Sequence, residues 1–358
     1  MIAIKNTLRL LTSTQAMASS LLSSAITLFG TLTLAKLAYN TTKLLWIQFI
    51  RRSHLPKYLP ASPSSPPSWA LITGSTDGIG LELARELLSA GFNVYLHGRN
   101  PSKLAAVKAS LLREAHPDRR IETLLADATD PNLDYSALAQ RVSSTPDSGP
   151  LKILINNAGG IPHPPTFSPL ETLPGENIDA QIALNARFPT RLTAALLPTL
   201  KSNAPSLVIN AGSYAGVLGM PFLVTYTASK GYVHSFTRAL RAEVEGMGLG
   251  GGSSGKGAVE VLGALIFDTA TARNSSAEDG GGGLAGLMRV SANACARGIL
   301  HKVGCGETLV APDWRHWATA NLMLCLPEKI ARGVLFGAVE GRRGEEVERL
   351  EGEGKKRS

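Results

Sequence analysis

The 358-residue sequence predicts an α/β fold: a central parallel sheet doubly wound by helices on both faces, preceded by a membrane-anchoring N-terminal helix. Three observations support this prediction. Strand-like apolar runs alternate with helical patterns from Trp69 onward, as in parallel α/β proteins. A glycine-rich turn, residues 74–80, joins the first of these strands to the first helix. Near the N-terminus, residues 10–35 include no charged side chain.

Residues 1–54 are predicted to be a membrane-associated segment. The uncharged stretch exceeds the roughly 20 residues that a helix needs to span a bilayer. A second apolar run, residues 44–50, leads into Arg51 and Arg52, and a basic pair favours the cytosolic side of a membrane. The alternative is a mitochondrial transit peptide, which is also rich in Arg and Ser and poor in acidic residues.

The positive charge of the chain belongs to this N-terminal segment. No Asp or Glu precedes Asp77, whereas seven Lys or Arg do, and without these seven the formal net charge falls from +8 to +1. A nucleic-acid partner is therefore not expected. Three cysteines make no disulfide framework, which suits a reducing cytosolic location. No Cys/His cluster has metal-ligand spacing, so no metal is expected, and His163 and His234 are assigned to a loop or a helix surface.

Residues 55–68, rich in Pro and Ser, are predicted to be a linker to a catalytic domain that spans residues 69–313. That domain opens with the strand-like run 69–73, the glycine turn and a helical pattern that Gly91 ends. A strand, a Gly-rich turn and a helix form the dinucleotide-binding unit of a Rossmann fold, whose glycines let the backbone approach a pyrophosphate at the helix N-terminus. The turn supplies six candidate cofactor-binding residues: Gly74, Ser75, Thr76, Gly78, Ile79 and Gly80.

The second strand-like run, residues 93–99, bears on the choice of cofactor. A site that prefers NAD places a carboxylate at the end of this strand, to bind the ribose hydroxyls. Here Gly98 stands at that end and Arg99 follows, and an arginine can pair with a 2′-phosphate. The sequence therefore predicts NADPH, which goes with reduction. The alternative is a solvent-exposed arginine that holds no ligand.

Tyr226 and Lys230, read with Ser213, are the candidate catalytic residues. A spacing of four residues places a tyrosine and a lysine on one face of a helix. A nearby ammonium favours the phenolate, so Lys230 is expected to lower the pKa of Tyr226 toward the range of an acid/base catalyst. Ser213 would hold the oxygen of a carbonyl substrate.

These motifs together resemble the short-chain dehydrogenase/reductase family over roughly residues 68–270. The resemblance implies that Ser213, Tyr226 and Lys230 are its catalytic trio, with Tyr226 and Lys230 also contacting the cofactor. The active-site asparagine of the family matches Asn185, within the helical stretch 179–200. Further cofactor contacts are implied for the acid that closes the strand-like run 123–127, for the Asn-Asn-Ala-Gly element that begins at Asn156 and for a later threonine: Asp127, Asn157, Ala158, Gly159 and Thr269.

The chain departs from the family pattern in three places. Ala264 and Leu265 replace the usual Pro-Gly pair that packs on the nicotinamide, although Thr269 is retained. Glycine-rich stretches at residues 246–257 and 280–283 are interpreted as flexible linkers. The loop 268–287 is expected to close over the substrate.

Residues 314–358 are predicted to be a C-terminal helical extension with a basic tail. The run 314–336 is apolar and helical in pattern, and Pro327 breaks it. This run is compatible with core packing, a homodimer contact or a surface lying on a membrane. Lys355 and Lys356 match a dilysine signal for retrieval to the endoplasmic reticulum. The alternative interpretation of these residues is a solvated charged tail.

The N-terminal segment, the basic C-terminal tail and the glycine turn resemble those of a membrane-bound subgroup of the family. This subgroup comprises the very-long-chain 3-oxoacyl-CoA reductases and the related 17-beta-hydroxysteroid dehydrogenases. This resemblance implies NADPH-dependent reduction of a ketone on a lipid-like substrate, at the endoplasmic reticulum membrane with a cytosolic catalytic domain. One alternative is a ketoreductase or dehydrogenase for a sterol or a secondary metabolite. A more remote one is a cofactor-binding scaffold with little catalysis, and the alternative location is mitochondrial.

Overall fold

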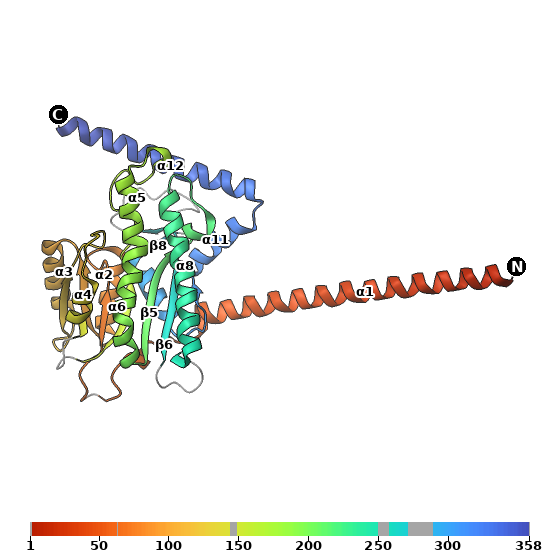
Figure 1. Ribbon diagram of the computed structural model, residues 1–358, viewed down its shortest axis with the longest axis horizontal. Helices are drawn as coiled ribbons and strands as arrows, with labels where there is room; N and C mark the ends of the chain where they lie inside the picture. The colour runs from red at the N-terminus through yellow and green to blue at the C-terminus, as the bar shows by residue number, and fades with distance from the viewer. Residues whose placement is uncertain (1, 63, 144–148, 250–257, 271–288, 358) are drawn as a thin grey trace. The chain divides into compact units, whose positions relative to one another are not determined.

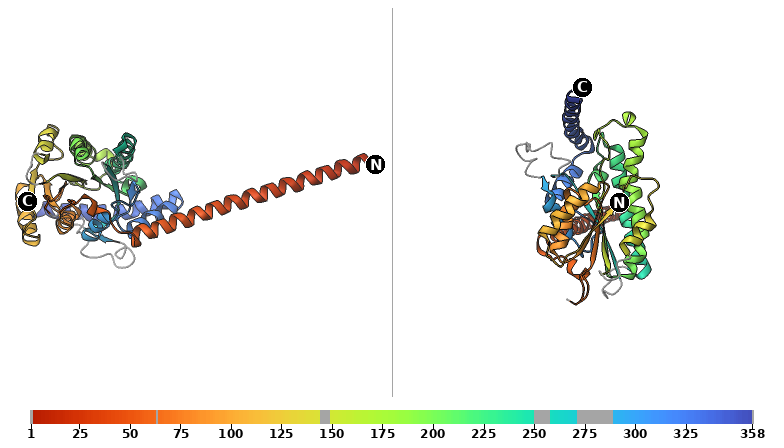
Figure 2. Two further views of the ribbon diagram at one scale, coloured as in Figure 1. Left: turned by 90° about the horizontal axis from the view of Figure 1, so that it is seen from below. Right: turned by 90° about the vertical axis from the view of Figure 1, so that its left-hand side faces the viewer.

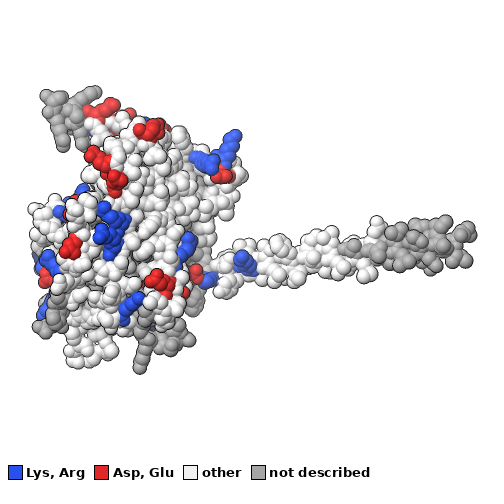
Figure 3. Space-filling model, viewed as in Figure 1, with Lys and Arg blue, Asp and Glu red and all other residues white. Residues whose placement is uncertain are grey.

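The computed structural model describes residues 2–62, 64–143, 149–249, 258–270 and 289–357 (Figure 1). Its contacts divide the chain into two units, Met1–Arg52 and Ser53–Ser358. The first unit holds helix α1 (Ile2–Leu45) and the π-helical turn η1 (Trp46–Ile50). Within it, Ser19–Ile50 is long and apolar enough to cross a membrane. Few charged side chains lie along the described part of this helix (Figure 3). The expected N-terminal apolar helix is thus present.

A seven-stranded parallel sheet forms the centre of the second unit. Its order is β3-β2-β1-β4-β5-β6-β9, and every neighbouring pair is parallel. The order reverses direction between β1 and β4, and open sheets of this kind bind ligands at the carboxyl ends of the strands around that point. The strands are β1 (Trp69–Ile72), β2 (Asn93–Gly98), β3 (Ile121–Leu125), β4 (Leu151–Asn156), β5 (Ser206–Ser213), β6 (Val259–Ile266) and β9 (Leu309–Val310).

Helices cover both faces of this sheet (Figure 2). Ala70 and Ile72 of β1 belong to one apolar core, whereas Trp69 and Leu71 belong to another, because successive side chains of a strand point to opposite faces. Strands buried on both faces read as continuous apolar runs, which explains why the run at β1 lacks alternation. The predicted doubly wound α/β fold is confirmed. Helices α2 (Gly78–Ser89), α3 (Pro101–Glu114) and α10 (Ala292–His301) supply the first core, and α4 (Tyr135–Ser143), α6 (Phe188–Ser202) and α8 (Val224–Val244) supply the second.

The remaining elements mostly surround the sheet ends. The expected helical stretch 179–200 lies within α5 (Gly175–Ile182), the π-helical turn η5 (Ala183–Arg187) and α6, which follow one another directly. Pro327 separates α11 (Trp314–Cys325) from α12 (Glu328–Arg357), as predicted. Helix α12 lies across one end of the second unit, near the start of α5 (Figure 1). The others are η4 (Leu170–Thr172), α7 (Ala215–Leu218), η6 (Glu245–Leu249), β7 (Thr269–Ala270) and β8 (Val290–Ser291).

The segment expected to be a linker begins with a packed turn. Residues Leu55–Tyr58 form the 3-10 helix η2, whose Leu55 and Tyr58 are buried in the first core. The Pro/Ser composition gave no sign of this, since two apolar side chains in a polar segment have no periodicity. Of the expected glycine linkers, residues 250–257 and 280–283 lie outside the described residues, as does most of the expected substrate loop, residues 271–287.

Glu260 of β6 fixes this packed turn to the sheet. Its carboxylate accepts hydrogen bonds from Lys57 Nζ at 2.8 Å, Tyr58 Oη at 2.6 Å and the Gly304 backbone N–H at 2.6 Å. Burial by itself would raise the pKa of Glu260, but the hydrogen bonds from Lys57 and Tyr58 hold it below its ordinary value. A carboxylate with a lowered pKa stabilises the folded state above its unfolded-state pKa, and loses that effect as the pH falls through the folded-state pKa.

We predict that Glu260→Gln lowers the free energy of unfolding of the full chain by about 1.5–3 kcal/mol at neutral pH, because a charged acceptor of three donors is lost. Urea unfolding followed by circular dichroism measures the change, with exposed Glu243→Gln as the matched control. The difference from the native chain should shrink as the pH is lowered, when the native carboxylate is itself protonated. Equal unfolding midpoints for both variants at neutral pH would contradict the role of Glu260.

Candidate active site

The turn between β1 and α2 has a tight geometry that only glycine accommodates. Gly74 and Gly78 have positive φ angles of 63° and 52°. A Cβ added to Gly80 would lie 2.3 Å from the Gly74 carbonyl oxygen and 2.5 Å from Asn157 Nδ2. The helix that follows begins at Gly78, and the first N–H groups of a helix have no acceptor within it. The turn therefore presents backbone N–H groups where a phosphate can approach them.

A buried histidine, which the sequence analysis missed, is hydrogen-bonded to this turn. His97 of β2 accepts a hydrogen bond from the Gly74 N–H through Nδ1 at 3.2 Å, and its ring stacks on Phe188 at 5.0 Å. Ser75 Oγ accepts from the His97 N–H at 2.9 Å. Burial lowers the pKa of His97 to about 4, so the ring is neutral and its nitrogen can accept. The only signal in the sequence was a polar residue inside an apolar strand.

The Asn-Asn-Ala-Gly element ties β4 to its neighbours. Asn156 Nδ2 donates to Asn210 Oδ1 of β5 and to Thr193 Oγ1 of α6, each at 2.8 Å. Asn157 Nδ2 donates to the Thr73 carbonyl at 2.9 Å, and the Asn157 and Ala158 N–H groups donate to Thr73 Oγ1. These bonds fix the start of the glycine turn against β4 and join β4 to β5 and α6.

Ser213, Tyr226 and Lys230 come together at the carboxyl end of β5. Ser213 is the last residue of β5, while Tyr226 and Lys230 lie in α8. The Ser213 hydroxyl lies close enough to the Tyr226 phenol to lower its pKa. Lys230 Nζ lies 5.8 Å from the centre of the Tyr226 ring and donates to the Ala211 carbonyl of β5 at 2.8 Å. One phenol, one hydroxyl and one amine thus share a site beside the turn.

The pKa of Tyr226 differs from the expectation. Burial raises the pKa of the Tyr226 phenol above its ordinary value, although the nearby Ser213 hydroxyl acts in the opposite direction. Burial also lowers the pKa of Lys230 to about 8. The expected lowering of the tyrosine pKa by Lys230 is therefore wrong for this structure, because the removal of the phenol from water disfavours the phenolate.

Asn185 approaches the same place from another element. It lies in the π-helical turn η5, and such turns are frequent at functional sites. Its Oδ1 accepts from the Gly160 N–H at 2.8 Å, and its Nδ2 donates to the carbonyls of Gly160 and Gln181. A Cβ on Gly159 would lie 2.9 Å from Lys230 Nζ and 3.0 Å from Asn185 Oδ1. Gly159 is thus the point at which both polar groups meet the loop after β4.

His234 is a second residue that the sequence analysis placed wrongly. It is 4% exposed rather than on a helix surface, and its Nε2 accepts the Ser213 N–H at 3.3 Å. A Cβ on Gly212 would come within 2.7 Å of that nitrogen. Burial foremost, and then the charge of Lys230, lowers the pKa of His234 to about 4, so the ring is a neutral acceptor. The available signal was its position one helical turn after Lys230, on the same face of α8. His163 is exposed, as expected of a loop residue.

The predicted adenosine end of the site lies on the far side of β1 from Ser213. Arg99 follows β2 and is exposed, and Asp127 follows β3, which ends two residues earlier than expected. Burial would raise the pKa of Asp127, but hydrogen bonds from Thr129 and the charge of Arg99 lower it. A Cβ on Gly98 would lie 2.9 Å from Thr76 Cγ2, so a carboxylate at this position would displace Thr76.

The two residues that stand in place of the Pro-Gly pair lie inside a regular strand. Ala264 and Leu265 pair with Ala211 and Gly212 of β5, and the ladder continues to Ile266 opposite Ser213. Thr269 is buried in β7, with its Oγ1 3.2 Å from the Phe267 carbonyl and 3.5 Å from His316 Nε2 of α11. Proline and glycine would interrupt this ladder, whereas alanine and leucine extend it.

Comparisons with known proteins show which family and which relatives this chain resembles. A family model described as short chain dehydrogenase matches residues 68–250. A very-long-chain 3-oxoacyl-CoA reductase of Coprinopsis cinerea is 34% identical over 183 residues, 51% of this chain and 52% of the relative. One of Aspergillus clavatus is 28% identical over 277 residues, 75% of this chain and 73% of the relative. A putative steroid dehydrogenase of Caenorhabditis elegans is 36% identical over 185 residues, 51% of this chain and 56% of the relative. The matches thus span about half the length of the Coprinopsis and Caenorhabditis relatives.

Solved structures share the fold. A short-chain dehydrogenase from Sphingobium yanoikuyae, in complex with NADPH, aligns with a TM-score of 0.54 at 26% identity, over 73% of this chain and 96% of that chain. A 7beta-hydroxysteroid dehydrogenase aligns with a TM-score of 0.63 at 20% identity, over 76% of this chain and 97% of that chain.

We predict that His234→Ala lowers the kcat of the NADP-dependent oxidoreductase reaction about tenfold, because the Ser213 N–H loses its acceptor and the serine shifts. The KM for the cofactor should stay unchanged, and His234→Asn, which restores an acceptor, should recover part of the rate. Steady-state kinetics at neutral pH measure this, with exposed His163→Ala as the control. A loss of rate that Asn does not relieve, or an equal loss in the control, would refute a positioning role.

Proposed function

This chain belongs to the short chain dehydrogenase family, and on that premise we propose that it reduces a ketone of a lipid-like 3-oxoacyl-CoA with NADPH. The observation that carries the proposal is the meeting of Ser213, Tyr226 and Lys230 at the carboxyl end of β5. A phenol and a hydroxyl that lie beside each other can hold one carbonyl oxygen between them, and the phenol can protonate it. This geometry also weighs against the scaffold alternative.

The residues fit a dinucleotide. The close approach of Gly80 to the Gly74 carbonyl leaves no room for a side chain in the turn, so the backbone can meet a pyrophosphate directly. The turn, residues 74–80, would hold the pyrophosphate, and Arg99 would pair with the 2′-phosphate of NADPH. Asp127 would contact the adenine, while Asn157, Ala158, Gly159 and Thr269 would line the nicotinamide side. NADPH, when bound, supplies the hydride.

The chain's own groups manage the proton and the carbonyl oxygen. Ser213 orients that oxygen, and Tyr226 donates its proton to it. Because burial raises the pKa of Tyr226, the phenol is protonated at neutral pH, which suits the reductive direction. Lys230 would hold the nicotinamide ribose, and its pKa of about 8 leaves it mostly charged at neutral pH. Asn185 would support a water relay that returns a proton to Tyr226.

The substrate class rests on the relatives. Two of them are named very-long-chain 3-oxoacyl-CoA reductases, which favours an acyl thioester. The second candidate is a sterol or secondary-metabolite ketone, which the putative steroid dehydrogenase relative favours.

The location follows from the N-terminal unit. The span Ser19–Ile50 would anchor the chain in the endoplasmic reticulum membrane with the catalytic unit in the cytosol, and mitochondria are the alternative. The division into segments 1–54, 55–68, 69–313 and 314–358, and a homodimer, remain predictions.

The test of function is NADPH oxidation by the purified full chain with a panel of ketones: a long-chain 3-oxoacyl-CoA, a keto-steroid and an aromatic ketone. We expect turnover of the acyl-CoA, and its loss in Tyr226→Phe by at least about a hundredfold, within the range that a general acid contributes. Fluorescence titration should give the same NADPH affinity for both proteins. Turnover of ring ketones alone would move the protein to sterol or secondary metabolism, and a fully active Tyr226→Phe would refute the mechanism.

The role of Arg99 predicts a change in cofactor preference. Arg99→Ala should raise the KM for NADPH about 10- to 100-fold, since a charge-assisted contact with the 2′-phosphate is lost, and leave the KM for NADH nearly unchanged. Kinetics with both cofactors measure this, and Arg113→Ala, an exposed arginine at the far end of α3, is the control. An equal effect on NADPH and NADH would contradict the assignment.

A further inference from the structure

The segment 267–270 leaves the sheet beside the candidate catalytic residues. It follows Ile266, the last residue of β6, which pairs with Ser213 and whose carbonyl accepts the Tyr214 N–H at 2.8 Å. Thr269, three residues further along the chain, is 3% exposed. Open parallel sheets bind their ligands at the carboxyl ends of the strands, so the position of Thr269 bears on the cofactor.

A buried histidine of α11 is hydrogen-bonded to this segment. His316 is 1% exposed, and its Nε2 lies 3.3 Å from the Asp268 carbonyl oxygen and 3.5 Å from Thr269 Oγ1. Burial, as the largest cause, lowers the pKa of His316 below its ordinary value, so the ring is neutral at neutral pH and carries one N–H. A carbonyl oxygen only accepts, so this N–H is on Nε2. His316 therefore donates to the backbone of the residue before Thr269.

Two other side chains of α11 contact the surroundings of this segment. Strand β7 pairs with β8, and Arg315 Nη1 donates to the Arg289 carbonyl, just before β8, at 3.2 Å. Two hydrogen bonds to Asp313, at 2.9 and 3.1 Å, fix the Arg315 guanidinium. Ala320, one turn after the histidine, belongs to the same apolar cluster as Phe267. Helix α11 is thus fixed against this segment on both sides of the histidine.

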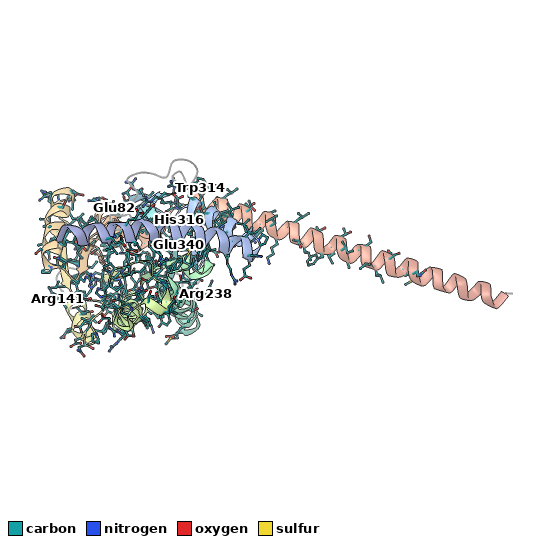
Figure 4. The ribbon with its side chains drawn as sticks, turned by 90° about the horizontal axis from the view of Figure 1, so that it is seen from above. Glu82, Arg141, Arg238, Trp314, His316 and Glu340 are labelled. Atoms are coloured by element: carbon teal, nitrogen blue, oxygen red, sulfur yellow. The ribbon has the colours of Figure 1, made fainter. Side chains whose placement is uncertain are left out.

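Helix α12 contacts the same segment at the surface. Seen from above, it crosses one end of the second unit (Figure 4). Arg342 Nη2 donates to Asp268 Oδ2 at 2.6 Å, but the Arg342 side chain is 53% exposed. Exposed ion pairs contribute little, whereas a buried backbone carbonyl that loses its donor is costly. The hydrogen bond from His316 is therefore the contact that matters most here.

This arrangement follows the two residues that replace the Pro-Gly pair. Ala264 and Leu265 continue the strand, so the chain leaves the sheet only between Ile266 and Thr269. Neither residue between β6 and β7 is a proline, so no ring restricts φ there. The position of Thr269 consequently depends on contacts from other elements.

We propose that His316 is a positioning residue for the cofactor: by holding the Asp268 carbonyl, it places Thr269 at the nicotinamide end of NADPH. This inference rests on the proposed function, in which Thr269 lines the nicotinamide side. It gives a role in the site to α11, which lies outside the residues that the family model matches. Because His316 acts through Thr269, its loss should weaken binding of the nicotinamide half of NADPH and spare the adenosine half.

Calorimetric titration of the full chain with NADPH and with adenosine 2′,5′-bisphosphate, which lacks the nicotinamide and its ribose, tests this role. His316→Leu keeps a buried side chain of similar size but removes the donor. We expect its dissociation constant for NADPH to rise about tenfold, as for the loss of one hydrogen bond, and that for the bisphosphate to stay within about twofold. His316→Gln, which can place an N–H near the same carbonyl, should recover part of the NADPH affinity. His116→Leu, the same substitution at an exposed histidine, should change neither constant.

Equal losses of affinity for both ligands in His316→Leu would indicate a general structural effect and overturn the inference. An unchanged NADPH affinity in His316→Leu, or no recovery in His316→Gln, would overturn it as well. In each of these cases the native chain still binds NADPH, so the proposed function stands. If the native chain binds neither ligand, the proposed function fails, and the role of His316 fails with it.

Discussion

The candidate active site depends on the contact between α8 and β5. Two side chains of one face of α8 reach the backbone of β5: Lys230 donates to the Ala211 carbonyl, and His234 accepts the Ser213 N–H. Both bonds reach backbone groups at the end of a strand that the sheet holds on both sides. The helix is thereby set at a rotation that brings Tyr226 to Ser213. Gly212 and Gly216 leave room for the imidazole, because a Cβ at either would collide with it or with the backbone of α8.

Burial, rather than pairs of opposite charge, governs the protonation of this site. His97 and His234 both have pKa values of about 4, so each is a neutral ring that accepts a backbone N–H. Lys230 and Tyr226 are shifted toward their uncharged forms for the same reason. A site of this kind keeps the phenol protonated until a substrate or cofactor changes its surroundings, which agrees with a proton donor in a reduction.

The C-terminal helix α12 holds two loops at one end of the second unit. The carboxylate of Glu346 and the ring of Phe336 act on two loops that are distant in sequence, and these loops meet through the bond between Ser168 and Phe222. Phe222 has a φ of 59°, which is strained for a bulky side chain, and contacts from outside its own loop sustain this strain. The apolar run 314–336, for which the sequence left core, interface and membrane roles open, divides at Pro327, and its second part supplies Phe336 to this contact.

The sequence by itself determined the parallel α/β fold, the glycine turn, the break at Pro327 and the grouping of Ser213, Tyr226 and Lys230, because each has a local signature in spacing or in backbone requirement. Only the tertiary structure decided that His234 and His97 are buried acceptors, that Leu55 and Tyr58 enter the core, and that Glu346 binds the loop at Thr166. These features join segments that lie far apart in the chain, or depend on which side of a helix the sheet covers. Periodicity within one segment does not specify its partner, and the pKa of a buried group depends on that partner.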